Sequence, residues 1–372
     1  MPTLDLAMPI ALFIVITVAL FLNKRVENKL VATVEQKEFK TRDILALAAF
    51  IVIMVVVIGY TSTVNPSGLV PNLLLLMFLA SYTMLLFTFS YVFTNLTRVR
   101  AQIVSAAFGA AALVAGLSSF AAPFTDMYTV YRAIGFFVLS GLCFAVVAYE
   151  QKFSTSKPRW YVAAQPPALF ILLFLSFAAI YEGAFNIWFP ILLDVFAFTF
   201  AILIILYLSS LFSWKTTWIF AAVLPIIDII LVFSGPMVVA AQTFTGLGLP
   251  VLVYLPNLPL VLTSAGEIGL RGLGLGDFFF AGILVTQTYK KFDLRAGLVA
   301  AAAIALSFGI WEAFLPDLFN YFGIEGFPAT VCIITGWLPV VAWKIFTTRN
   351  QIKPPEPATT AEQAAQPTAN PL

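Results

Sequence analysis

The sequence predicts an all-α polytopic membrane protein, a bundle of about eleven transmembrane helices. Hydrophobic residues make up 61% of the 372 positions and charged residues only 10%, whereas soluble proteins carry about 25% charged residues. The hydrophobic residues form long continuous runs separated by short polar breaks, which is typical of membrane-spanning helices. A membrane β-barrel would instead show alternating polar and apolar residues.

Each of these runs is long enough to cross a bilayer, because about 20 helical residues rise through ~30 Å of hydrocarbon. The first run follows Asp5, lacks a preceding basic segment and is followed by basic residues from Lys24 onward, so we interpret it as a membrane helix and not as a cleaved signal peptide. The predicted helices lie near residues 7–22, 44–61, 70–93, 101–121, 132–149, 162–181, 187–212, 218–240, 272–290, 295–313 and 327–346.

The basic residues indicate how these helices are oriented. When the connecting segments are assigned alternately to two sides, all but Arg132 and Arg271 of the chain's 20 basic residues fall on one side. The positive-inside rule then predicts an N-terminus outside and a C-terminus in the cytoplasm.

Two stretches do not have the character of membrane helices. Residues 350–372 are rich in Pro, Ala, Thr and Gln, which predicts a disordered tail. The segment 243–271 contains Gly and Pro around two short apolar runs, Val251–Leu255 and Leu258–Leu262. These runs are too short to span, so they are either strands or an apolar loop lying over the bundle.

The composition also excludes several kinds of chemistry. The chain has no histidine, which rules out Ser–His catalysis, and it has neither a CxxC nor an HExxH pattern for a metal. We therefore expect no metal and no cofactor. Cys143 and Cys332 lie inside apolar runs and are interpreted as buried core residues. No basic patch indicates nucleic-acid binding.

Four acidic residues lie inside the predicted spans, where an ionisable group costs about 2.5–3.5 kcal/mol and is therefore a candidate for function. Asp194 and Glu312 are isolated and belong to no motif, so we predict packing or cavity-lining roles for them. Asp228 precedes a helix break expected at Gly235-Pro236 by ~9 Å, and Asp277 lies ~7.5 Å from the predicted start of its helix. Both of these helix ends face the outer side, so the two carboxylates can reach the same depth.

A pair of carboxylates held together in a low dielectric shares one proton. Such a pair supplies a general base for water and a general acid for a peptide carbonyl, without histidine or metal. The glycines in Leu273-Gly-Leu-Gly allow close approach of another helix and weaken their own helix, which suits the entry of a substrate chain. The alternatives are a buried polar contact between helices and a proton or cation path.

The segment from Leu273 to Asp277 resembles the Gly-x-Gly-Asp motif of presenilins and signal peptide peptidases, a family of intramembrane aspartyl proteases. In that family a second aspartate lies in the preceding helix, matched here by Asp228, and a Pro-Ala-Leu motif begins the last helix. The resemblance implies that Asp228 and Asp277 are catalytic. It implies a substrate site shaped by Gly274, Leu275, Gly276, Pro328, Ala329 and Thr330.

The chain departs from the family at two positions: Ile227 stands where a tyrosine is usual, and Thr330 replaces the leucine of the Pro-Ala-Leu motif. Both departures leave the carboxylates intact and bear on activity level and substrate preference. The resemblance implies a presenilin-like nine-helix core over residues 67–346. Residues 1–66 would then be an extra N-terminal transmembrane hairpin, and residues 347–372 a tail.

The resemblance implies an intramembrane aspartic endopeptidase that hydrolyses peptide bonds within transmembrane helices or signal peptides. Because the charge pattern places segment 243–271 outside, the core is similar to signal peptide peptidases in orientation. Its partners would be transmembrane peptide substrates and membrane lipid, and no partner subunit is evident. An ion- or proton-coupled transporter and a homologue that binds membrane helices without cleaving them are the alternative functions.

Overall fold

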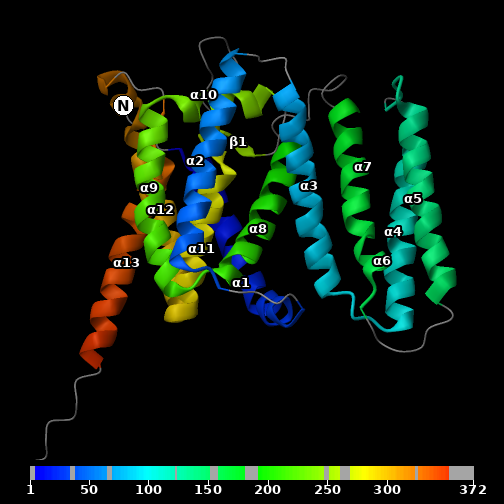
Figure 1. Cartoon of the computed structure of the whole chain (residues 1–372), viewed down its shortest axis with the longest axis horizontal. Helices are drawn as coiled ribbons and strands as arrows, with labels where there is room; N and C mark the ends of the chain where they lie inside the picture. The colour runs from blue at the N-terminus through cyan, green and yellow to red at the C-terminus, as the bar shows by residue number, and fades with distance from the viewer. Residues whose placement is uncertain are drawn as a thin grey trace, which may run out of the picture.

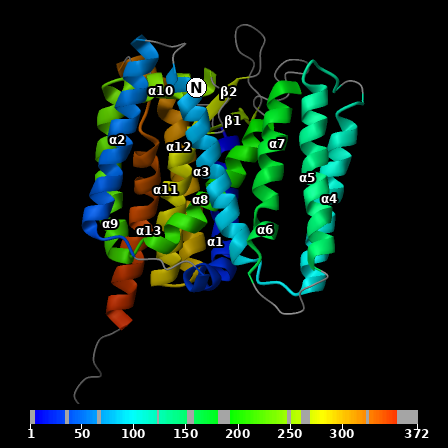
Figure 2. The same ribbon diagram turned by 45° about the vertical axis from the view of Figure 1, so that its right-hand side comes forward.

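The computed structural model describes residues 5–33, 38–64, 69–121, 124–150, 158–180, 192–246, 251–259, 269–322 and 326–351. These residues form a helical bundle with one two-stranded sheet (Figures 1 and 2). The helices are α1 (Ala7–Thr33), α2 (Thr41–Val64), α3 (Leu69–Val92), α4 (Arg98–Ser118), α5 (Thr129–Tyr149), α6 (Trp160–Ala163), α7 (Gln165–Ile180), α8 (Leu193–Leu211), α9 (Trp214–Phe233), α10 (Pro236–Gly246), α11 (Leu275–Lys291), α12 (Leu294–Phe322) and α13 (Ala329–Gln351).

Within the described residues, ten helical segments are long and apolar enough to cross a membrane. The chain is therefore an integral multi-pass membrane protein, and the predicted fold class is confirmed. The expected span at 272–290 corresponds to α11, which has only 17 residues. At 1.5 Å per residue α11 covers ~26 Å, less than the ~30 Å of the hydrocarbon core.

The start of this helix differs from the prediction, because the chain before Leu275 is extended. Leu270–Gly274 forms strand β2, which pairs antiparallel with β1 (Leu252–Pro256). The backbone groups of these residues are thus satisfied by the sheet, and helical hydrogen bonding begins only after it. The first of the two short apolar runs is therefore a strand. Most of the second run, residues 260–262, lies outside the described residues.

The expected helix break after Asp228 is confirmed. The predicted helix 218–240 is divided into α9 and α10 at Gly235, whose φ of 95° is a left-handed conformation that favours glycine. Pro236 then begins α10, where its missing N–H is not required. The break turns the chain at the end of the bundle where the sheet also lies (Figure 1).

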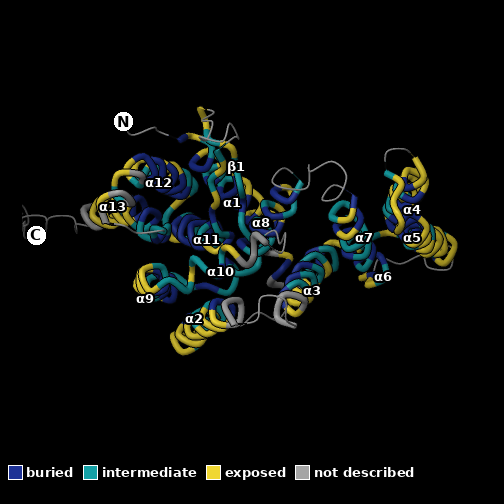
Figure 3. The backbone as a smooth tube through the Cα atoms, turned by 90° about the horizontal axis from the view of Figure 1, so that it is seen from above, coloured by how far each residue is buried: buried dark blue, intermediate teal, exposed yellow. Residues whose placement is uncertain are grey.

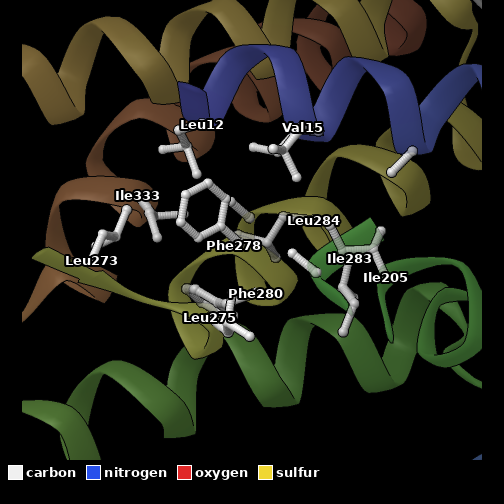
Figure 4. Packing of buried hydrophobic residues seen from close by; sticks show 14 of the residues in the cluster. Leu12, Val15, Ile205, Leu273, Leu275, Phe278, Phe280, Ile283, Leu284 and Ile333 are labelled. Atoms are coloured by element: carbon white, nitrogen blue, oxygen red, sulfur yellow. The ribbon is translucent and has the colours of Figure 1, made fainter. Parts of the chain in front are cut away.

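Helix α11 forms the centre of the bundle. It contacts α1, α8, α9, α12 and α13, and almost its whole length is buried (Figure 3). Figure 4 shows Phe278, Ile283 and Leu284 of α11 packed between Leu12 of α1 and Ile205 of α8. A residue placed on this helix is consequently surrounded by protein on nearly every side.

The first two helices also pack against helices of the predicted core. Helix α1 lies against α8, α11 and α12, whereas α2 lies against α9 and α10. The assignment of residues 1–66 to an extra hairpin stays a prediction, but α1 is part of the packing around α11. Helices α4, α5 and α7 pack together at the other side of the molecule, next to α3 (Figure 3).

The sheet is attached to the bundle by one of the intramembrane acids. The carboxylate of Asp194, at the start of α8, accepts a hydrogen bond of 2.9 Å from the backbone amide of Tyr254 in β1. Asp194 is buried, and its position matches the packing role expected for it. β1 and β2 are thereby held at one end of the bundle, directly before the first turn of α11.

Candidate active site

Asp228 lies near the end of α9 and contacts the first turn of α13. Its Oδ2 atom accepts two hydrogen bonds from Thr330, one from the hydroxyl at 2.6 Å and one from the backbone amide at 3.3 Å. The residue retains 9% of its accessible surface. Thr330 therefore joins α13 to α9 at this carboxylate and orients it.

Asp277 is the third residue of α11, immediately after the sheet. Its carboxylate interacts with the backbone amide of Gly274, the residue that precedes the helix. The N-terminus of a helix carries a partial positive charge, which stabilises a carboxylate placed there. A Cβ atom at position 274 would lie 3.2 Å from Oδ2 of Asp277. The absence of a side chain at Gly274 thus makes room for the carboxylate.

The structure brings the two aspartates together. Asp228 acts electrostatically on Asp277, and both act on Cys332 of α13. Asp277 is half-buried and Asp228 keeps some exposed surface, so water can reach the pair. The site is therefore built where α9, α11 and α13 meet, from residues that are far apart in the sequence.

The other predicted site residues have different surroundings. Gly276 is exposed, Gly274 and Ala329 are half-buried, and Pro328 is buried. Leu275 is buried in the main hydrophobic core, beside Phe280 in Figure 4. The position of Leu275 is consistent with packing beneath the site.

A cavity of about 960 Å³ lies beside the two aspartates, between α9, α10, the sheet, α12 and the start of α13. Its wall includes Ala329 and Cys332, which flank Thr330, and Val232, one helical turn beyond Asp228. Gly272 and Leu273 of β2 also line it. Non-helical backbone at membrane depth is tolerated where it is buried in protein or lines a water-filled cavity. Strand β2 before the short helix α11 fits this description.

Sequence reasoning missed three polar residues of this cavity: Tyr254, Gln242 and Arg271. Glu312, for which a packing or cavity-lining role is expected, does line the cavity wall. Cys332, expected only as a core residue, is buried but lies at the cavity next to the aspartates. No local pattern marks these residues, because their neighbours in space come from other helices.

Among the described residues, no group of three or more Cys, Asp or Glu side chains is arranged to hold a metal ion. The side chains gathered at the site supply two carboxylates, one hydroxyl and one thiol. A scan against protein-family models and a search of curated proteins each find no match to this chain.

Proposed function

We propose that this protein is an intramembrane aspartyl protease that hydrolyses peptide bonds within transmembrane helices or signal peptides. The observation that carries the proposal is the Asp228–Asp277 pair, which lies beside a large cavity within a membrane bundle. The Gly-x-Gly-Asp sequence and the Pro-Ala segment, whose similarity to presenilins and signal peptide peptidases is described above, support the same function.

In the proposed reaction the two carboxylates share one proton. The ionised carboxylate removes a proton from a water molecule, and the water attacks the carbonyl carbon of the scissile peptide bond. The protonated carboxylic acid donates its proton to the carbonyl oxygen. The carboxyl group that accepted the proton of water then donates it to the amide nitrogen and the C–N bond breaks. A hydroxyl of the tetrahedral intermediate returns its proton to the other carboxylate, which restores the singly protonated pair. Thr330 and the amide of Gly274 keep the two carboxylates oriented during these transfers.

A substrate helix has to unwind before it can be cut, and its freed backbone groups then need partners inside the membrane. Strand β2 is suited to provide them. In the described sheet β2 has β1 as its neighbour, and Gly272 and Leu273 line the cavity. An extended substrate could therefore add a strand along β2 and place its peptide bond beside Asp277.

The charge pattern supports a substrate orientation like that of signal peptide peptidases. The two termini of the helical bundle lie at opposite ends, with the sheet at the end where α1 begins (Figure 1). The opposite end carries basic residues at the boundaries of several helices, including Arg98, Lys215 and Lys291. If that end faces the cytoplasm, the sheet faces outward. The resemblance to signal peptide peptidases would then imply substrates with cytoplasmic N-termini.

The first test is cleavage of a labelled single-span substrate by the purified full-length protein in detergent, with mass spectrometry to locate the cut. We expect wild type to cut within the span and a double Asp228→Asn, Asp277→Asn variant to leave it intact. Persistent binding without cutting by wild type would favour the non-cleaving homologue. Ion-dependent flux in proteoliposomes, without cleavage, would favour the transporter.

The contact between Thr330 and Asp228 gives a second test. Thr330→Val removes the hydroxyl but keeps the shape of the side chain and the backbone amide, so we expect cleavage to fall about tenfold or more. A hydrogen bond to a charged group contributes about 1.5–3 kcal/mol, and 1.4 kcal/mol corresponds to a factor of ten. Thr330→Ser, which retains the hydroxyl, should keep most of the activity. Equal rates for Thr330→Val and wild type would show that the hydroxyl has no part in catalysis.

A further inference from the structure

Three charged residues from distant parts of the chain meet beside the sheet. Arg271 of β2 lies with Nε 3.6 Å from Oδ2 of Asp5, just before α1, and with Nη1 3.1 Å from Oε1 of Glu312 on α12. The side chain of Arg271 is 24% exposed. Asp5 and Glu312 are 3% and 5% exposed, respectively. The cluster therefore consists of two buried acids and one partly exposed base.

Asp5 is occupied by structural contacts. Its Oδ1 atom accepts hydrogen bonds from the backbone amides of Ala7, at 3.0 Å, and Leu258, at 2.8 Å. It thereby caps α1 and ties the N-terminal segment to the chain that follows β1. These contacts also fix the position of the Asp5 carboxylate, which forms one of the two ion pairs of Arg271.

Each acid keeps one buried oxygen without a hydrogen-bond partner among the described residues, Oδ2 of Asp5 and Oε2 of Glu312, but of the two acids it is Glu312 that lines the cavity. Oε1 accepts a hydrogen bond from Arg271, whereas Oε2 is buried and has no hydrogen-bond partner among the described residues. A buried carboxylate oxygen without a partner costs free energy. Both Glu312 and Arg271 line the 960 Å³ cavity that passes beside the aspartates. The residue that carries the unsatisfied acceptor thus lines the cavity that a substrate would occupy.

The charge of the cluster indicates which ligand would satisfy this acceptor. Two carboxylates oppose one guanidinium group, so one negative charge remains uncompensated when both acids are ionised. The other polar side chains of the cavity wall, Gln242 and Tyr254, are neutral groups. An anionic ligand would have to compete with Asp5 and Glu312 for Arg271. A cationic ligand could instead bind Oε2, which has no protein partner to be displaced among the described residues, and would gain a charge-assisted hydrogen bond.

The distance along β2 places the cluster relative to the reacting bond. Arg271 precedes Gly274 by three residues, or ~10 Å at about 3.3 Å per residue in a strand. A substrate strand lying beside β2 would cover this distance with about three of its own residues. The cluster thus lies toward the outer end of the substrate relative to Asp277.

We propose that Glu312, positioned by Arg271, forms a subsite that accepts a lysine or arginine side chain of the substrate, about three residues from the scissile bond toward the sheet end of the bundle. This subsite rests on the proposed protease function. It specifies the substrate class as a membrane segment whose outer portion carries a basic residue near the cleavage site.

The experiment uses single-span substrates that differ at one position, the third residue from the mapped cut toward the sheet end, occupied by Lys, Arg, Met or Glu. We expect wild type to cleave the Lys and Arg substrates about tenfold more efficiently, in kcat/KM, than the Met substrate, which corresponds to one charge-assisted contact. The Glu substrate should be the poorest. This order is measured on the unmodified protein and requires no variant to fold.

Glu312→Gln then tests whether this carboxylate is the source of the preference. The ratio of kcat/KM between the Lys and Met substrates should fall to near one. Asp317→Asn is the matched control, because it removes an acid on the same helix at an exposed position, and it should keep the wild-type ratio. An equal loss for both substrates in Glu312→Gln would assign the residue a structural role and overturn the subsite.

Two outcomes separate the subsite from the protease proposal. If wild type cuts the Lys and Met substrates equally well, the subsite is wrong and the protease function stands. If wild type cuts neither, the protease function fails, and binding of the fluorescently labelled Lys and Met peptides to the full-length protein is measured by anisotropy. Tighter binding of the Lys peptide that is lost in Glu312→Gln would still support a cation-binding subsite, and equal binding would overturn it.

Discussion

An Asp277→Asn protein should bind its substrate and cleave it about a thousandfold more slowly than wild type, or not measurably, and Asp228→Asn should behave in the same way. General acid and base catalysis by a positioned side chain contributes about 10²–10⁴ in rate. An amide can neither take the proton of the attacking water nor deliver one to the carbonyl oxygen. Because the two carboxylates act as a unit, the loss of either member should cost nearly as much as the loss of both.

Loss of the fold would not explain such a result, because asparagine has almost the same shape as aspartate. In Asp228→Asn, the amide oxygen of the new side chain can still accept the hydrogen bonds from Thr330 that the carboxylate accepts in wild type. Thermal unfolding of each variant checks this directly. Asp194→Asn is the matched control, since Asp194 is also a buried intramembrane acid but contacts the backbone of Tyr254.

We expect Asp194→Asn to retain cleavage within a few-fold of wild type. If either Asp228→Asn or Asp277→Asn keeps a tenth or more of wild-type activity, the assignment of the pair is wrong. If Asp194→Asn is equally inactive, intramembrane acids matter in general, and a proton path through several of them becomes the better explanation.

The second large effect concerns stability, at the contact between α12 and α13. A Cβ atom added at Gly336 would lie 2.6 Å from the carbonyl oxygen of Ala303 and 2.7 Å from Cα of Ile304. Both are backbone atoms of α12, so no side-chain rotation relieves the overlap and the helices must move apart. Overpacking of this kind typically costs about 1–3 kcal/mol. Gly336→Ala should therefore lower the thermal unfolding midpoint by at least a few degrees.

The matched control for this variant is Gly141→Ala on α5, because an added Cβ there meets nothing within 4 Å. Its unfolding midpoint should stay the same or rise slightly, since alanine is the better helix former. Gly336→Ala should also reduce cleavage, because α13 carries Thr330 in the first turn. An unchanged midpoint for Gly336→Ala would mean that α12 and α13 are not packed as closely as the structure shows.

The closeness of α12 and α13 illustrates a general feature of membrane bundles. Helices in lipid gain little from burying apolar surface against one another, so close contact between backbones at small residues becomes important. Gly282 on α11 is a milder example, because an added Cβ would meet the side chain of Ile205 rather than backbone. A flexible side chain can give way, so a smaller loss of stability is expected at that position.

Much of the candidate site could be predicted without the structure. Asp228 and Asp277 were identifiable because isolated acids in apolar runs are rare, and one of them follows a distinctive glycine pattern. The break at Gly235 was equally predictable, since glycine and proline in succession both disfavour the interior of a helix. In each case the signal lies within a few neighbouring residues.

Residues that acquire their roles through distant contacts could not be assigned in this way. Residues 272–274 of strand β2 were expected to begin a helix, because nothing local shows that β1 is available as a partner. In the sequence, Thr330 is only a difference from the Pro-Ala-Leu motif. The structure shows that its hydroxyl donates a hydrogen bond of 2.6 Å to Asp228. The cluster around Arg271 joins residues 5, 271 and 312, which no pattern in the sequence connects.

Local composition and spacing were therefore enough to predict the membrane fold, the helix break and two candidate catalytic acids, because solvation by lipid and backbone preferences act on neighbouring residues. The central position of α11, the sheet before it and the partners of Glu312 and Asp228 depend on how the helices pack. Packing brings together residues that are more than 100 positions apart in the case of Asp228 and Thr330. Such partners become visible only in three dimensions.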